Sequence, residues 1–328
     1  MERIAVPILK VNYLLVDWYS DILKCNCEVR TEVLMSFLTY LINGISLGSV
    51  YALIALGYTM VYGIAKMLNF AHGDVIMVGA FATYTVCSTM GLSPVLGVLV
   101  SIVLCTTLGM VIEKIAYKPL RKASSPLAVL ITAIGVSYFL QNMALLIFGS
   151  NMKSFTSVVS LNSMKLFGGQ INVSGETIVT IITCIVVMTV LMLFINKTKA
   201  GQAMLAVSED KGAAQLMGIN ANATITLTFA IGSALAAVAG VLLCSAYPSL
   251  TPYTGSMPGI KAFVAAVFGG IGSIPGAFIG GILLGVIENL SKAYISSQLS
   301  DAIVFAVLII VLLVKPTGLL GKNIQEKV

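Results

Sequence analysis

Long apolar runs follow one another along most of this 328-residue chain, with short polar stretches between them. A helix needs about 20 predominantly apolar residues to cross the hydrocarbon core of a membrane. The runs that approach this length lie at residues 37–64, 68–90, 93–116, 126–149, 176–196, 223–247, 259–279, 280–298 and 301–315. Because backbone polar groups in lipid are satisfied within helices, we predict an all-α, polytopic integral membrane protein with eight or nine transmembrane helices.

Composition supports the same class of protein. The chain is 58% hydrophobic and only 10% charged, whereas a soluble domain has roughly 25% charged residues. The net charge of +6 could suggest nucleic acid, but the basic residues fall in short blocks between apolar runs, as in the loops of membrane proteins. We expect contact with membrane lipid and no nucleic-acid partner.

The basic residues also predict how the chain is oriented. Under alternating spans, one side of the membrane receives Lys66 and the clusters at 114–122, 197–211 and 315–327. The other side receives only Lys153, Lys165, Lys261 and Lys292, apart from residues 1–34. Since positive residues accumulate on the cytoplasmic side, the first side is cytoplasmic. It includes the C-terminus, and an odd number of spans places the N-terminus outside.

The chain divides into three parts of unequal size. Residues 1–34 mix both signs of charge, and Met35 opens the first long apolar run. We expect residues 1–34 to be an N-terminal extension, either disordered, the product of an upstream start, or a short surface helix. Residues 35–322 form a single transmembrane domain, and residues 323–328 form a cytoplasmic tail. Residues 150–175 form a polar exterior connection.

A glycine-dense segment covers residues 269–285. Gly272, Gly276 and Gly280 recur every four residues, a spacing that lets membrane helices approach closely. The Ile274-Pro275 step removes a backbone donor and favours a break in the helix. We therefore assign these three glycines to helix packing and expect a broken or re-entrant helix near 265–281.

No catalytic arrangement is present in the sequence. It has one histidine and lacks the G-x-x-x-x-G-K-[ST] loop that binds nucleotide phosphates. We expect no catalytic residue, cofactor or metal, and no ATP hydrolysis by this chain alone, so the energy for any uphill transport comes from a partner subunit or from an ion gradient. Ionisable and polar groups at membrane depth often mark transport paths, and the candidates for a path or gate are Asn69, His72, Asp74 and Glu288. For the first three, a hydrogen-bonded structural role is the alternative.

The longest cytoplasmic loop spans residues 196–222, and its middle is rich in residues that favour helices. Asp210 lies near the start of a short helix that ends at Gly218, a common helix stop. A short rigid helix between two spans offers a surface to which a peripheral motor subunit can bind. The alternative interpretation is a solvated loop.

Four blocks in order then resemble a known family: LNFAHGDVIMVGAF (68–81), AVSEDKGAAQLMGIN (206–220), FGGIGSIPGAFIGGILLGVIE (268–288) and KPTGLLG (315–321). They resemble the membrane permeases of branched-chain amino acid ABC importers, of the high-affinity leucine/isoleucine/valine type. The likeness covers about residues 35–322. It implies a multi-pass subunit of the bacterial plasma (inner) membrane that translocates branched-chain or related aliphatic amino acids.

The resemblance also implies partners and a coupling segment. The partners are two ABC ATPase subunits, a second homologous permease and an extracytoplasmic amino-acid-binding protein. The coupling positions are Glu209, Asp210, Ala213, Ala214 and Gly218, although Lys211-Gly212 before the alanine pair departs from the pattern of other importer classes. Two alternatives remain: a permease for another small polar solute (urea, short amides, a sugar or a nucleoside), and an ion-coupled secondary transporter.

Overall fold

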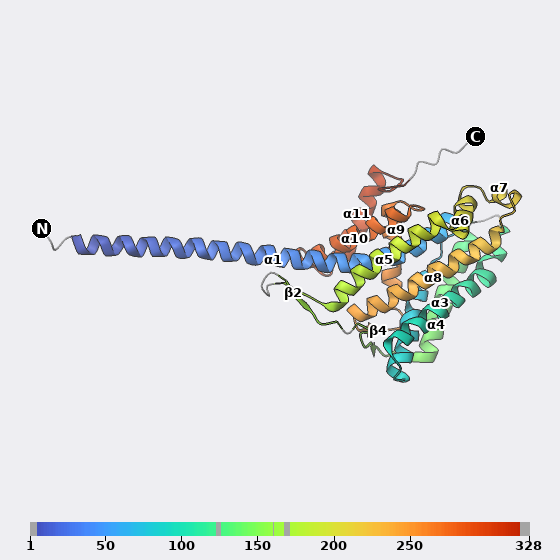
Figure 1. Cartoon of the computed structure of the whole chain (residues 1–328), viewed down its shortest axis with the longest axis horizontal. Coiled ribbons are helices and arrows are strands. Elements are labelled where there is room, and N and C mark those ends of the chain that lie inside the picture. Colours follow the sequence, from blue (N-terminus) through green and yellow to red (C-terminus); the bar gives the residue numbers. More distant parts are fainter. Residues whose placement is uncertain (1–4, 123–125, 160, 167–170, 322–328) are drawn as a thin grey trace.

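The structure is a computed structural model that describes residues 5–122, 126–159, 161–166 and 171–321, and it is almost entirely helical (Figure 1). The α-helices are α1 (Ala5–Ala65), α2 (His72–Tyr84), α3 (Pro94–Ile112), α4 (Pro126–Phe148), α5 (Gly175–Lys197), α6 (Lys199–Glu209), α7 (Lys211–Leu216), α8 (Ala221–Ala246), α9 (Ser256–Gly269), α10 (Ile274–Tyr294) and α11 (Ser300–Val314). Two π-helical turns, η1 (Thr85–Thr89) and η2 (Glu113–Tyr117), extend α2 and α3, and a 3₁₀ turn, η3 (Pro119–Lys122), follows.

The polytopic all-α prediction is confirmed. Within the described residues, six helices are long and apolar enough to cross a membrane: the part of α1 from Glu32 to Ala65, α3 with η2, α4, α5, α8 and α10. The shorter helices α9 and α11 have 14 and 15 residues. Side chains such as Leu146 and Leu313, about 80% exposed, form apolar outer surfaces suited to lipid.

One predicted boundary between spans was wrong. The sequence analysis divided residues 259–298 at 279/280, whereas α9 ends at Gly269 and α10 begins at Ile274. Pro275 occupies the first turn of α10, where its missing N–H costs no helical hydrogen bond. The break therefore lies at residues 270–273, within the predicted region 265–281.

The helices pack as two similar sets. α1 packs on α9 and α10, and α8 packs in the corresponding way on α2 and α3. α2 packs on α3 as α9 packs on α10, and α2 contacts α9 between the sets. α1 runs toward the end of the bundle that carries α6 and α7, whereas α8 starts at that end and runs the opposite way (Figure 1), so the arrangement is an inverted repeat. Transporters built this way bind their substrates near the mid-plane, where the two repeats meet.

The N-terminal part of α1 extends away from this bundle (Figure 1). Residues 5–34 continue without a break into the first span. The division into an extension, a permease domain and a tail stays a prediction. Residues 1–4 and the predicted tail at 323–328 lie outside the described residues.

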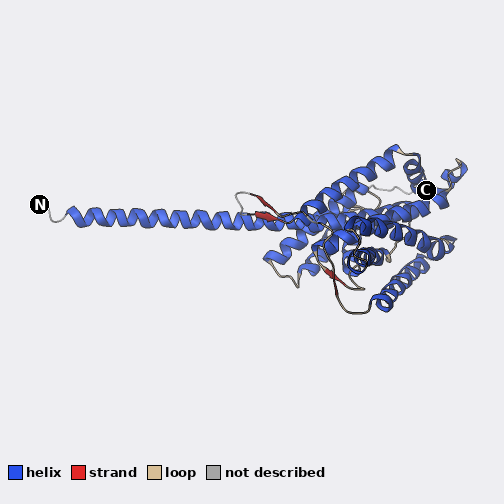
Figure 2. Ribbon diagram, turned by 60° about the horizontal axis from the view of Figure 1, so that its bottom comes forward, coloured by secondary structure: helices blue, strands red, loops and turns tan. Residues whose placement is uncertain are grey.

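Two short strand pairs replace part of the expected exterior connection (Figure 2). β2 (Met164–Leu166) and β3 (Ile171–Val173) form an antiparallel hairpin. β1 (Lys153–Ser154) pairs antiparallel with β4 (Ser249–Leu250). The second pair ties the connection before α5 to the segment that leads into α9, and so helps to position the start of α9.

Candidate functional site

Two helices begin deep in the bundle after irregular backbone. Residues 66–71 precede α2, and residues 247–255 precede α9. A Cβ atom on Gly57 would lie 2.5 Å from His72 Nε2. Gly57 lies eight residues before the end of α1, which is about 12 Å of helix. The start of α2 therefore lies well inside the bundle.

The N-termini of α2 and α9 meet at this depth. A Cβ atom on Gly255 would overlap the carbonyl oxygen of Gly73, and one on Gly259 would lie 2.8 Å from Gly73 Cα. Glycine at these positions lets the two backbones touch. Irregular backbone at membrane depth is tolerated where it is buried in protein or lines a cavity, and both conditions hold here.

A cavity of about 520 Å³ lies beside this meeting point, within the range of 300–1,000 Å³ typical of small-molecule sites. Its lining comes from α1, α2 and the irregular segment before it, α4, α9 and the segment before α9: Tyr58, Phe70, Gly73, Asp74, Ile134, Ser137, Tyr138, Gln141, Tyr253, Ser256, Gly259 and Ile260. Polar and apolar side chains therefore line the same space.

Asp74 is the charged residue of this lining, and it is only 2% exposed. Gln141 on α4 donates a hydrogen bond from Nε2 to Asp74 Oδ1 at 2.9 Å. The same nitrogen lies 3.3 Å from Ser256 Oγ on α9. Gln141 thus joins three helices around the cavity, and Asp74, one of the candidates for a transport path, borders it.

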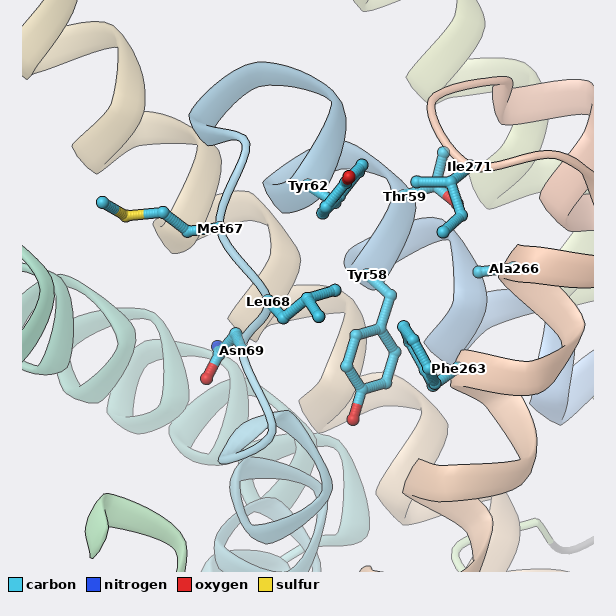
Figure 3. A pocket seen from close by; sticks show the side chains of 9 residues that line it. All are labelled: Tyr58, Thr59, Tyr62, Met67, Leu68, Asn69, Phe263, Ala266 and Ile271. Carbon is cyan, nitrogen blue, oxygen red and sulfur yellow. The ribbon is translucent and has the colours of Figure 1, made fainter. Parts of the chain in front are cut away.

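Asn69 lies in the irregular segment before α2. Its side chain is buried and accepts a hydrogen bond from the Tyr117 hydroxyl of η2 at 2.9 Å, and its carbonyl accepts from His72 N. Asn69 also lines a second cavity with Tyr58 and Phe263 (Figure 3). That cavity measures about 10 Å³, room for at most one water.

His72 lies in neither cavity lining. Its ring is 1% exposed and packs edge-on against Tyr58, with 4.7 Å between the ring centroids. Nε2 has no hydrogen-bond partner among the described residues and faces Gly57. The ring fills the space that the missing Gly57 side chain leaves between α1 and α2.

Glu288 lies away from the cavity in a buried ionic cluster. It accepts hydrogen bonds from Lys261 at 2.8 Å, Lys292 at 2.5 Å and the Tyr51 hydroxyl at 2.9 Å. Lys261 also pairs with Asp301 at 2.6 Å. The sequence analysis counted Lys261 only among the residues of the exterior side. In the structure it is a buried residue of α9 that joins α10 and α11 through their carboxylates.

The three glycines assigned to helix packing play two different roles. Gly276 and Gly280 lie in α10, where a Cβ on either would collide with backbone of α9 near Gly269. Gly272 lies in the turn between the helices with φ +90°, and no heavy atom lies within 4 Å of where its Cβ would be. Conformation rather than packing therefore favours glycine at position 272.

The predicted coupling segment forms α6 and α7, at the end of the bundle away from the projecting part of α1 (Figure 1). Asp210 caps α7 by accepting hydrogen bonds from the backbone of Gly212 at 2.7 Å and Ala213 at 3.0 Å. Gly218 follows α7 with φ +83°. Ala214 is buried against the bundle, while Glu209 and Ala213 are exposed.

Two large apolar side chains are exposed at the end of α7. Leu216 and Met217 are 90% and 82% exposed. A loop that only contacts solvent does not require such exposure of large apolar side chains. The segment is joined to the bundle by α8, whose first turn begins at Ala221.

A buried ion pair contacts the first turns of α8, the helix that follows this segment. Arg121 of η3 pairs with Glu113 of η2 and donates to Asn222 of α8 at 2.6 Å. Glu113 also accepts a hydrogen bond from Thr226 of α8 at 2.6 Å. Glu113 and Tyr117 bound the same π-turn, so the start of α8 connects through η2 to Asn69.

Gln141, Lys261 and Tyr117 are among the residues that the sequence analysis did not assign to a site. Gln141 and Lys261 are polar residues within apolar runs, a signal that membrane depth makes informative. Tyr117 carries no such signal, because its hydroxyl partner lies 48 residues away in the chain.

Comparisons with known proteins bear on this arrangement. The family model described as branched-chain amino acid transport system / permease component matches residues 40–312. The high-affinity branched-chain amino acid transport system permease protein LivH of Salmonella typhimurium is 46% identical over 311 residues, which cover 91% of this chain and 100% of that protein. LivH of Escherichia coli K12 is 45% identical with the same coverage. BraD of Pseudomonas aeruginosa is 45% identical over 304 residues, which cover 89% of this chain and 98% of BraD.

The relatives are similar over nearly their full length, and the matched region includes both helix breaks and the segment α6–α7. Together with the six apolar helices, the comparisons identify a multi-pass protein of the inner membrane. The chain belongs to the family of permease components of branched-chain amino acid transport systems.

Proposed function

We propose that this chain is the permease subunit of an ABC importer and passes aliphatic amino acids through the cavity between α2, α4 and α9. The cavity carries the proposal, because it is large enough for such a solute and lies where the two repeats meet. Its walls combine Ile134, Ile260 and Phe70 with the polar group Asp74, Gln141 and Ser256. An amphipathic solute fits such a lining better than urea or another wholly polar solute.

A second permease subunit completes the path in this proposal. Tyr138 and Tyr253 line the cavity yet are 63% and 56% exposed, so one flank of the cavity is open. A polar cavity that opens toward lipid is unfavourable, and a homologous permease on this flank would close it. An extracytoplasmic binding protein would deliver the amino acid at the end of the bundle that carries β2 and β3.

Two ATPase subunits would bind the cytoplasmic face at α6 and α7. Leu216 and Met217 offer the exposed apolar contact, and the capped α7 makes it rigid. Movement of this segment would reach α8, then η2 through Glu113 and Arg121, and then Asn69 through Tyr117. In this way the motor would act on the helix break beside the cavity, while ATP hydrolysis stays in the partner.

Reconstitution in liposomes tests the proposal. The chain is combined with its partner permease, the ATPase subunits and the binding protein, and leucine uptake is measured. We expect uptake to require ATP on the side of the liposome membrane where the ATPase subunits lie. Uptake should stop when the nucleotide-binding loop of the ATPase is inactivated. Leucine uptake by the permease alone would establish a secondary carrier, and uptake of urea or short amides in place of leucine would overturn the substrate class.

A further inference from the structure

The carboxyl group of Asp74 is buried at membrane depth with neutral partners. Its 2.9 Å contact is the amide of Gln141, and no cationic side chain within the described part of the chain forms an ion pair with it. The nearby intramembrane lysine, Lys261, is already paired with Glu288 and Asp301. A carboxylate removed from water is costly unless a positive partner compensates it.

Glu288 shows the contrast within the same molecule. Glu288 is 1% exposed and is therefore buried as deeply as Asp74, but it accepts hydrogen bonds from two lysines and a tyrosine hydroxyl. It also lines no described cavity. Asp74 borders about 520 Å³ of empty space instead, so the compensating charge can come from a molecule that enters the cavity.

The geometry points to Asp74 as the group that receives the α-ammonium of the transported amino acid, and we infer a substrate subsite formed by Asp74 and Gln141. This inference rests on the proposed function. Gln141 holds the carboxylate in place from α4, while Ile134 and Ile260 provide apolar surface for an aliphatic side chain on the same cavity. A solute that carries a primary ammonium and a branched aliphatic chain can pair with Asp74 and pack against Ile134 and Ile260.

The test measures ligand-dependent thermal stabilisation of the assembled permease–ATPase complex in nanodiscs, without the binding protein. Three ligands at equal millimolar concentration separate the chemistry: leucine, isopentylamine (the ammonium and side chain alone) and 4-methylpentanoate (the carboxylate and side chain alone). We expect leucine and isopentylamine to raise the unfolding temperature of the unmodified complex, and 4-methylpentanoate to leave it unchanged. Asp74→Asn should abolish the shift, and the matched control Glu176→Gln, near the exterior end of α5, should retain it.

The inference is overturned if Asp74→Asn is stabilised by leucine as much as the unmodified complex, if 4-methylpentanoate acts as well as leucine, or if sodium alone produces the shift. Absence of any shift in the unmodified complex also overturns it. ATP-driven leucine uptake by the unmodified importer is measured in parallel. Uptake without the ammonium-dependent shift contradicts the subsite alone, whereas absence of uptake contradicts the proposed function.

Discussion

Glycine and histidine fit together at the first helix break. The His72 ring occupies the space beside Gly57, and a Cβ there would lie 2.5 Å from Nε2 and 3.2 Å from the Gly232 carbonyl oxygen. Gly57→Ala should therefore overpack the contact of α1 with α2 and α8 and destabilise the protein by about 1–3 kcal/mol. Thermal unfolding in detergent measures this loss.

Gly135→Ala is the matched control, because no heavy atom lies within 4 Å of a Cβ on Gly135 in α4. It should leave the unfolding temperature unchanged or slightly higher. The double variant Gly57→Ala/His72→Ala should be more stable than Gly57→Ala alone, since truncating the ring relieves the collision. A Gly57→Ala protein as stable as the unmodified one would contradict the packing role of His72.

The ionic cluster makes a second prediction at this scale. Glu288→Gln leaves Lys261 and Lys292 without the carboxylate they share, so we expect a loss of about 3–5 kcal/mol of unfolding free energy, as for other broken buried pairs. Lys292 is 38% exposed, and Lys292→Ala should cost less than about 1 kcal/mol. Equal unfolding temperatures for the two variants would contradict a buried cluster centred on Glu288.

Individual site residues could be predicted from the sequence only in part. Asp74 was a path candidate because a carboxylate is rare inside an apolar run. The sequence did not predict that Asp74 borders a cavity while Glu288 lies in an ionic cluster, because their partners Gln141 and Lys261 come from other helices of the chain. Gly272 followed the packing spacing, yet its place in the turn depends on where α10 begins.

At the scale of helices, α7 presents the surface proposed for the motor. Leu216→Ser/Met217→Ser removes exposed apolar side chains that pack little against the rest of the chain, so folding should be unaffected. Loss of an interface anchor typically costs about 2 kcal/mol or more, which weakens binding more than tenfold. Quantitative co-purification of the ATPase subunits measures this effect.

Met164→Ser on β2 is the control, because Met164 is also exposed, at 55%, but lies in the exterior hairpin. It should retain the ATPase subunits in full. If Leu216→Ser/Met217→Ser retains them equally, the ATPases bind elsewhere on the chain.

The π-turn η2 makes a prediction about coupling. Tyr117→Phe keeps the ring but removes the hydroxyl that donates to Asn69, one hydrogen bond of about 1 kcal/mol. We expect leucine uptake per ATP hydrolysed to fall several-fold while ATPase activity and assembly remain. Uptake and hydrolysis that fall in proportion would indicate a structural role instead.

Most helices could be predicted because the thickness of the hydrocarbon core sets the length of an apolar run. The break before α10 carried a proline signal. The break before α2 carried no such signal, because residues 66–71 include apolar residues that would equally suit a membrane helix. Their irregular backbone is supported by Tyr117 and by the contacts around Gly57. The strand pair β1–β4 joins segments nearly a hundred residues apart and has no local signal either.

At the scale of the whole molecule, two inverted sets of helices meet around one cavity, and a cytoplasmic segment connects to the same place. Each set contributes a helix that begins at this depth, α2 in one and α9 in the other. In the proposed function, this arrangement provides a route for the solute and a connection through which its walls can be moved.

Filling the cavity tests this account most directly. Ser137→Trp places a large ring in the cavity from α4, while Phe139→Trp places the same ring on the outer face of α4, where Phe139 is 62% exposed. In the reconstituted importer, Ser137→Trp should reduce ATP-driven leucine uptake more than tenfold with the ATPase subunits still bound, and Phe139→Trp should transport normally. Wild-type uptake by an assembled Ser137→Trp importer would show that the amino acid takes another route.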